Sequence, residues 1–178
     1  NGSVYLINPN SIVIGPSGII DTAGFVASTL DLSNGEFLGS GDMSFLGDSE
    51  GAIKNLGDIV ARHGNVVIIA RAIENEGSIT ASEGVVDLAG GYSELLLKEG
   101  GRKHIAVKAS LGGGSIKNSG TIEAVEATLE ASGGDIYSLA VDCGGTINAT
   151  GATEQNGRII LFADTGKTEV SGDLKALG

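Results

Sequence analysis

Cysteine and proline are nearly absent from this 178-residue sequence, with one Cys and two Pro, and tryptophan is absent altogether. A single Cys cannot form a disulfide within the chain, so packing must stabilise the fold. No run approaches the roughly 20 apolar residues that a membrane-spanning helix needs, and we therefore expect no membrane span. The composition excludes a disulfide scaffold and favours one packed domain over residues 1–178.

Basic residues are scarce as well. The sequence has 11 Lys and Arg against 22 Asp and Glu, which gives a formal net charge of −11. Residues 1–50 contain six acids and no Lys or Arg. Because nucleic acids and anionic membranes are bound through basic surfaces, the charge argues against both as partners.

Glycine, by contrast, is abundant. It accounts for 30 of the 178 residues, beside 41% hydrophobic residues, whereas its usual share is about 7%. Gly accepts a positive φ without steric cost, so this composition predicts many short strands joined by tight turns.

A nine-residue pattern recurs along the chain. The pattern Ile-x-Asn-x-Gly-x-Ile-x-Ala occurs at 53–61, 73–81 and 116–124, and a divergent copy lies at 141–149. The first two copies start 20 residues apart, and we interpret the 43 residues to the third as two periods with an insertion. Alternating apolar runs such as Val66, Ile68 and Ala70 indicate strands, and no window has a helical period.

Short strands that recur about every 22 residues predict a parallel β-helix, in which stacked coils bury one continuous core. We expect an all-β, right-handed solenoid of roughly eight coils, about 40 Å long. A β-sandwich also uses short strands, but it does not require identical residues at one phase of every unit. The segment near residues 95–108 is expected to leave the regular coil as a hairpin.

Three asparagines, Asn55, Asn75 and Asn118, occupy one position of the repeat. Stacked Asn side chains can hydrogen-bond along the rod and satisfy backbone groups at its bends, which predicts a structural ladder and not a ligand site. Cys143 occupies the equivalent position of the fourth copy. We expect its thiol to be buried and unreactive.

A more specific signal lies in residues 8–41. It begins with the turn Asn8-Pro9-Asn10-Ser11-Ile12 and continues through Gly15, the run VASTLD at 26–31, and FL at 37–38. This combination resembles the haemagglutination-activity (secretion) domain of filamentous haemagglutinin-like exoproteins, the cargo of two-partner secretion. That family usually has Gly where Ser11 stands, so a positive φ at this position would be strained here.

The resemblance implies a right-handed parallel β-helix that is secreted across a Gram-negative outer membrane through a barrel partner. It also implies display at the cell surface as an adhesin or fibre, with a receptor or glycan that the sequence does not identify. It divides the domain into secretion-domain-like coils at 1–50 and repeat coils at 51–178. Since the family has further coils ahead of the turn, we expect a fragment of a longer chain, with both coil ends covered by neighbouring chain or other copies.

Enzymatic chemistry has little support in the sequence. Lyases and hydrolases built on β-helices need acids clustered on one face, and the Asp residues here share no such register. His63 and His104 have no Cys or carboxylate at metal-ligand spacing. We expect no catalytic residue, no metal and no cofactor. A carbohydrate-active enzyme is a third hypothesis, after a structural filament subunit that stacks through open coil ends.

One segment is locally basic. The run LLLKEGGRKHIAVK at 95–108 contains four of the 11 basic residues, namely Lys98, Arg102, Lys103 and Lys108. These side chains are candidates for contact with an anionic glycan or an acidic neighbour. A solvated turn without a ligand is the simpler interpretation.

Overall fold

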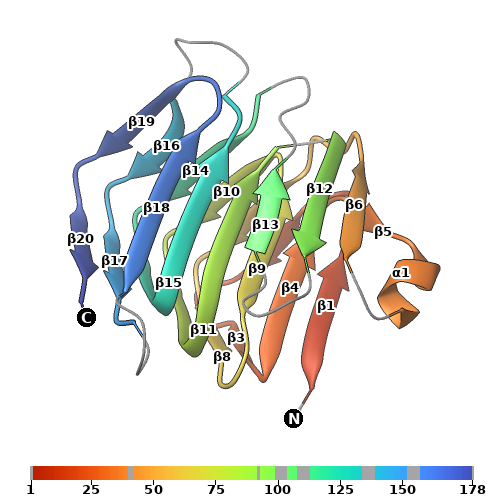
Figure 1. Ribbon diagram of the computed structural model, residues 1–178, viewed down its shortest axis with the longest axis horizontal. Coiled ribbons are helices and arrows are strands. Elements are labelled where there is room, and N and C mark those ends of the chain that lie inside the picture. Colours follow the sequence, from red (N-terminus) through yellow and green to blue (C-terminus); the bar gives the residue numbers. More distant parts are fainter. Residues whose placement is uncertain are drawn as a thin grey trace.

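The chain folds as a three-sided parallel β-helix (Figure 1). The computed structural model describes residues 2–39, 42–91, 93–98, 104–107, 113–133, 139–151 and 157–177. Each coil passes through three faces in turn, and its strands pair in parallel with their equivalents in the neighbouring coils. The predicted all-β fold and parallel β-helix are confirmed.

The three faces are named by their strands. Face 1 contains β1 (Ser3–Ile7), β4 (Gly24–Ser28), β9 (Val66–Ala70), the second halves of β11 (Ser78–Gly90) and β15 (Thr121–Ala131), and β18 (Arg158–Ala163). Face 2 contains β2 (Ile12–Ile14), β7 (Ala52–Asn55), β10 (Ala72–Asn75), β14 (Ser115–Asn118), β16 (Leu139–Cys143) and β19 (Lys167–Val170). Face 3 contains β3 (Ile19–Thr22), β8 (Asp58–Ala61), the first halves of β11 and β15, β17 (Thr146–Ala149) and β20 (Asp173–Ala176).

Each face holds six strands in the described parts of the chain, and the prediction of roughly eight coils is wrong. The 43-residue step between repeat copies is a single coil, because Ile73 pairs directly with Ile116. The chain leaves the coil between β4 and β7 and again between β11 and β14, so residues counted as coil lie outside it. Five steps of ~4.8 Å make a stack of about 24 Å, shorter than the predicted length.

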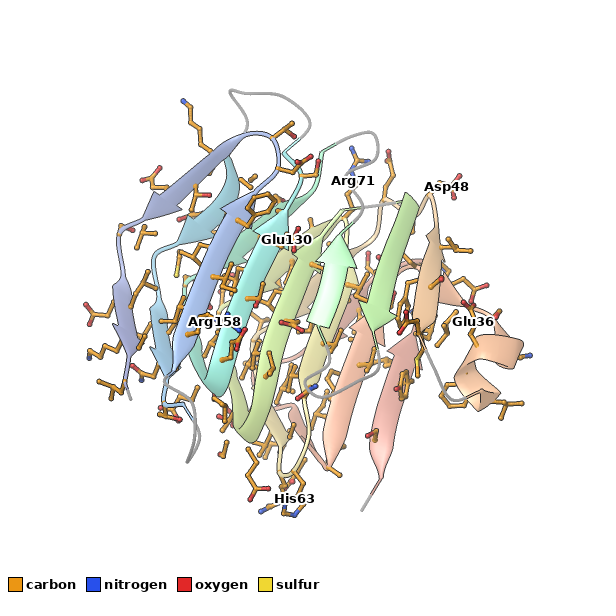
Figure 2. All side chains as sticks on the ribbon, in the orientation of Figure 1. Glu36, Asp48, His63, Arg71, Glu130 and Arg158 are labelled. Atoms are coloured by element: carbon orange, nitrogen blue, oxygen red, sulfur yellow. The ribbon has the colours of Figure 1, made fainter. Side chains whose placement is uncertain are left out.

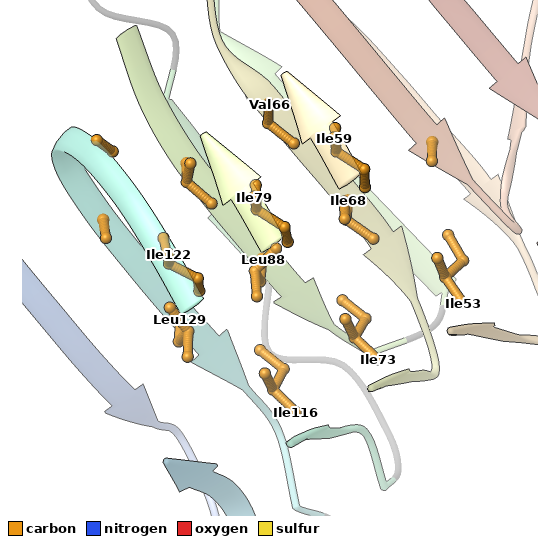
Figure 3. Packing of buried hydrophobic residues seen from close by; sticks show 14 of the residues in the cluster. Ile53, Ile59, Val66, Ile68, Ile73, Ile79, Leu88, Ile116, Ile122 and Leu129 are labelled. Atoms are coloured by element: carbon orange, nitrogen blue, oxygen red, sulfur yellow. The ribbon is translucent and has the colours of Figure 1, made fainter. Parts of the chain in front are cut away.

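Stacked files of aliphatic side chains fill the interior. Ile53, Ile73 and Ile116 follow one another along face 2 in direct register. Figure 3 shows this file meeting Ile68 and Leu88, which point inward from face 1. Each coil buries its apolar side chains only against its neighbours, so stacking supplies the core.

The glycine of the repeat stands at the corner between faces 2 and 3, where successive coils touch through their backbones. A Cβ added there would lie 1.9–2.3 Å from a carbonyl oxygen of the preceding coil, a separation that real Cβ atoms essentially never show. The same holds in five successive coils, at Gly57, Gly77, Gly120, Gly145 and Gly172. Close approach of the coils therefore explains this glycine column.

The two segments that leave the coil meet in a four-stranded antiparallel sheet. The first contributes β5 (Asp31–Leu32), the short helix α1 (Asn34–Leu38) and β6 (Met43–Gly47). The second contributes the hairpin of β12 (Ser93–Lys98) and β13 (His104–Val107), and the strand order is β13-β12-β6-β5. The predicted excursion near 95–108 is confirmed, and its tip at 99–103 lies outside the described residues.

This antiparallel sheet covers the outer surface of face 1 and forms a second core. Leu32, Met43 and Phe45 pack with Val67 and Ile69 of β9, and none of the five is more than 9% exposed. The strand β9, of sequence VVIIA, is therefore buried on both sides. A continuous apolar run is what such a strand requires.

Candidate functional site

The NPNSI motif at residues 8–12 forms an exposed turn between β1 and β2. The backbone N–H of Asn10 donates to Asn8 Oδ1 at 3.0 Å, which closes the turn. Ser49 Oγ donates to the carbonyl of Pro9 at 2.6 Å and ties the turn to the next coil. Asn8, Pro9 and Asn10 are exposed, whereas Ile12 is buried in the core. The motif is therefore a structural turn at a corner of the coil, and its residues 8–10 face solvent.

Ser11 holds this corner in a conformation that side chains rarely adopt. Its φ is +103°, and it is the only non-glycine residue with a positive φ in the described parts of the chain. Such a conformation is strained for a residue with a Cβ. Ser11 Oγ accepts a hydrogen bond from the backbone N–H of Ala52 at 3.0 Å, a contact that the glycine typical of the motif would not make.

The repeat asparagines form a buried column on face 2. Asn55 Nδ2 donates to Asn75 Oδ1 at 2.8 Å, and Asn75 Nδ2 donates to Asn118 Oδ1 at 2.7 Å. Asn118 Nδ2 in turn approaches the sulfur of Cys143 at 3.8 Å. Burial raises the pKa of the Cys143 thiol, and the contact with Asn118 opposes this only in part. The column is buried and supports the backbone of the coil, since Asn55 Oδ1 accepts the N–H of Gly57 at 3.2 Å.

Most of the basic segment at residues 95–108 lies outside the part of the chain whose side chains the structure describes. Only the backbone of Lys98 belongs to the described part of the chain, while Arg102, Lys103 and Lys108 lie outside it. Contact of these side chains with a polyanion therefore stays a prediction.

An alternating row of charges occupies four successive strands of face 2 and ends at β19, where Glu169 stands beside Asp142. In direct register it contains Lys54, Glu74, Lys117 and Asp142. Lys54 Nζ lies 3.1 Å from Glu74 Oε2 and 2.6 Å from Glu76 Oε1, and these hydrogen bonds raise the pKa of Lys54, the bond to Glu76 most. Sequence reasoning missed this row, although the residue before the asparagine of the repeat alternates in sign between copies. Opposite charges in register favour the observed pairing of strands.

Acidic side chains gather on face 1 where the antiparallel sheet ends. Glu126 is 1% exposed, and its Oε2 lies 3.0 Å from Arg158 Nη2 on the neighbouring strand. Burial, and then the nearby carboxylate of Asp164, raise the pKa of Glu130. Figure 2 shows Arg158 and Glu130 toward opposite ends of this surface. Sequence reasoning missed this group because no local pattern shows which outward positions of neighbouring coils lie side by side.

A cleft of about 310 Å³ opens at the other end of face 1 and is lined by Tyr5, His63, Asn65 and Glu83 among others. His63 Nδ1 lies 3.1 Å from Glu83 Oε2, and both side chains are about two-thirds exposed at 64% and 66%. Within the described ranges, no group of three or more His, Cys, Asp or Glu residues is placed to hold a metal ion. Nor does the described structure contain a helix long and apolar enough to cross a membrane.

Comparison with known proteins places this geometry in context. Over 98% of its length the chain is 32% identical to the heme/hemopexin-binding protein of Haemophilus influenzae, and it spans 20% of that protein. It also superposes on the crystal structure of the HMW1 secretion domain from Haemophilus influenzae with a TM-score of 0.67. That match has 25% sequence identity and covers 98% of this chain and 54% of the other.

The family profile gives the same result for the whole chain. The profile of the TPS secretion domain, TPS standing for two-partner secretion, matches residues 1–176. The resemblance inferred from the NPNSI turn and the repeats is confirmed by this match and by both relatives. The chain belongs to the family of two-partner secretion domains, the secreted, β-helical segments of exoproteins.

Proposed function

We propose that this domain directs a longer exoprotein across the outer membrane of a Gram-negative bacterium through a dedicated barrel partner. The match of the family profile over residues 1–176 carries the proposal, since the family is defined by secretion. The chain spans about a fifth of the curated relative it matches, and in this proposal it is one part of a larger cargo. The division into secretion-domain-like coils at 1–50 and repeat coils at 51–178 belongs to this proposal.

The fold suits passage through a narrow pore. Each coil of a solenoid contacts only its neighbours, so its folding needs no distant part of the chain. Here the parallel pairing joins each strand to the equivalent strand one coil earlier. A chain that emerges in extended form can therefore add one coil after another to those already folded. The stability gained with each coil would oppose backward movement.

The protein's role outside the cell is non-enzymatic in this proposal. The exoprotein remains at the cell surface as an adhesin, and the domain forms the start of its shaft. The match of the family profile to a secretion domain supports a binding or structural role. The Haemophilus influenzae relative is named a heme/hemopexin-binding protein, which is consistent with a binding role for the exoprotein in this proposal.

A structural observation favours the second hypothesis, stacking at the coil ends. Val4 and Leu6 continue the inward-facing files of face 1, yet they are 45% and 40% exposed. At the other end Val170 and Leu174 are 46% and 40% exposed, although their partners Cys143 and Ile147 are fully buried. Further coils of the same chain, or other copies, would cover both ends.

Deletion of the barrel partner tests the secretion proposal. In cells that lack it, we expect the exoprotein to disappear from the medium and the cell surface and to be retained or degraded in the periplasm. Immunoblots of medium, surface-labelled and periplasmic fractions would measure this, with the barrel restored from a plasmid as the control. Undiminished secretion without the barrel would contradict the proposal.

A further inference from the structure

Two adjoining hollows lie along the corner where the chain passes from face 3 to face 1. One is the cleft of about 310 Å³ at the start of the face 1 strands. The other has a volume of about 420 Å³ and is lined by Gly2, Asp21, Thr22, Ala23 and Arg62. His63 lines both, and Figure 2 shows it at the edge of the molecule where these strands begin. Small molecules usually bind in pockets of about 300–1,000 Å³. We call the two hollows together the corner groove.

The cleft exists because one outward position of face 1 has no side chain. At the start of the strands, the outward positions of successive coils are Ser3, Gly24, Asn65 and Val85. A Cβ built on Gly24 would point at Ser3 Oγ, 2.9 Å away. Gly24 has no positive φ, so its backbone does not require glycine. The surface of the sheet is therefore bare at Gly24, with a polar side chain on either side.

Polar groups surround the bare position. Asn65 Oδ1 accepts the N–H of Val85 at 2.9 Å, which fixes the side-chain amide. Within the described ranges, no hydrogen bond occupies Asn65 Nδ2 or Ser3 Oγ. His63 and Glu83 stand beside them with their side chains about two-thirds exposed. The cleft thus offers an amide donor, a hydroxyl, an imidazole and a carboxylate within one small space.

An aromatic ring and an apolar floor complete the cleft. The floor contains Val26, Val67 and Val85. Tyr5 lines the cleft, and its ring meets that of Phe37 edge to face, with centroids 5.2 Å apart and planes at 78°. Because Tyr5 also packs against the core beneath the antiparallel sheet, its ring is held in place. A fixed aromatic ring provides a rigid apolar contact beside the polar groups.

The charged side chains of the corner groove are paired with one another. Arg62 donates to Asp21 from Nε at 2.6 Å and from Nη2 at 2.5 Å. His63 Nδ1 lies 3.1 Å from Glu83 Oε2. Among the described lining residues, no cation is therefore left to bind a sulfate, phosphate or carboxylate. The net charge of −11 also repels anions, so the corner groove suits an uncharged ligand.

We propose that the corner groove binds a neutral saccharide, with one sugar ring in the cleft and the next ring in the hollow beside Arg62. A pyranose ring has an apolar face of C–H groups and an edge of hydroxyl groups. The face matches Tyr5 and the valine floor, and the hydroxyls match Asn65, His63 and Glu83. This binding site is separate from the proposed role in secretion and does not depend on it.

An array of immobilised neutral, sialylated and sulfated oligosaccharides tests the class of ligand. We expect the purified protein to bind neutral oligosaccharides and not the sialylated or sulfated ones. Binding only to the acidic oligosaccharides, or to none of the array, would overturn the proposal.

Filling the cleft tests its location. Gly24→Val places a side chain over the bare position, and binding should fall at least tenfold, since the sugar ring and the new methyl groups need the same space. The matched control is Gly15→Val at the corner between faces 2 and 3, where a Cβ has nothing within 4 Å. The control should bind normally, and circular dichroism should show that both variants are folded.

A second substitution preserves the volume of the cleft. Asn65→Asp keeps an oxygen that can accept the N–H of Val85 but removes the Nδ2 donor. Loss of this hydrogen bond to the sugar should weaken binding about tenfold. Asn10→Asp, which introduces the same charge at an exposed turn, should not. Equal binding by the Asn65 and Asn10 variants would show that the sugar binds elsewhere.

Fluorescence gives an independent measurement, because the chain contains no tryptophan. Tyr5→Trp places a single indole in the cleft, and its emission should change saturably when the strongest neutral oligosaccharide of the array is added. The same titration with Gly24→Val added should give no saturable change. An emission that stays constant while the array shows binding would overturn the cleft as the site. Barrel-dependent secretion, which deletion of the barrel tests, stands or falls separately from these results.

Discussion

Ser11 shows how a single residue at a coil corner balances two opposing terms. Its φ of +103° costs conformational energy, while its Oγ accepts the N–H of Ala52 from the next coil. A residue held in such a conformation costs about 1–3 kcal/mol. A hydrogen bond to a neutral partner contributes about 1 kcal/mol. Substitutions that separate the two terms should therefore have different effects.

We expect Ser11→Ala to be less stable than the unaltered protein by about 1 kcal/mol, because the strain stays and the hydrogen bond is lost. Ser11→Gly loses the same bond but relieves the strain, so it should exceed the Ala variant in stability by about 1 kcal/mol or more. Urea unfolding followed by circular dichroism measures both.

Ser17 provides the matched control, because it lies in the next turn and has no positive φ. There the order should reverse, with Gly less stable than Ala, since Gly gives the unfolded chain more freedom. A Gly variant at position 11 that is no more stable than the Ala variant would show that the strain is negligible.

At the scale of elements, the antiparallel sheet joins segments that are distant in sequence. Its central pair, β12 and β6, is antiparallel with Leu95 opposite Phe45. Phe45 is fully buried, and with Met43 it fills the space above Val67 and Ile69 of β9. The antiparallel sheet therefore covers the outer surface of face 1. We expect the Phe45 side chain to provide most of the stability that this sheet contributes.

Phe45→Ala should reduce the free energy of unfolding by about 3–5 kcal/mol, because it leaves a cavity between two sheets. Leu46→Ala, one residue further along the same strand, should cost less than about 1 kcal/mol because Leu46 is 49% exposed. Chemical denaturation gives both values. Similar costs for the two variants would mean that the antiparallel sheet adds little to the stability of the chain.

The repeats predicted the β-helix because its corners impose the same demand on every coil. Asn55, Asn75 and Asn118 recur since each bonds to the next, and Gly recurs since the coils meet there without room for a Cβ. The antiparallel sheet has no such signature. Its strands occur once each and pair across long separations in sequence, so neither their partners nor their coverage of β9 follows from local pattern.

The error in coil number has the same origin. A segment that leaves the coil has the same length and alternation as a coil, and only the pairing of Ile73 with Ile116 shows that the chain returns to the adjacent position. The outward exposure of Ile160 and Phe162 on face 1 was likewise not predictable. Ile160 and Phe162 alternate with Ile159 and Leu161, and nothing local indicates which pair faces outward uncovered.

At the scale of the whole molecule, the open ends should make the chain self-associate. Val4, Leu6, Val170 and Leu174 expose apolar surface that matches the interior files, beside strand edges that can pair. We expect the purified 178-residue chain to form oligomers whose average mass, measured by light scattering after size exclusion, rises with concentration. Leu174→Lys should weaken this association, and Leu46→Lys, away from both ends, should not.

A stable, monodisperse monomer over a wide range of concentration would contradict the expectation. It would mean that the end coils stay folded in water with their apolar side chains exposed.

The glycine column has a further consequence for how such a protein can change in length. Inserting a single residue within a strand would turn the inward side chains that follow it in that strand outward. It would also move a residue with a Cβ into the position of the repeat glycine, against a carbonyl of the preceding coil. Inserting a whole coil would preserve both relations and add one more layer. The coil is therefore the smallest unit by which the β-helix can lengthen.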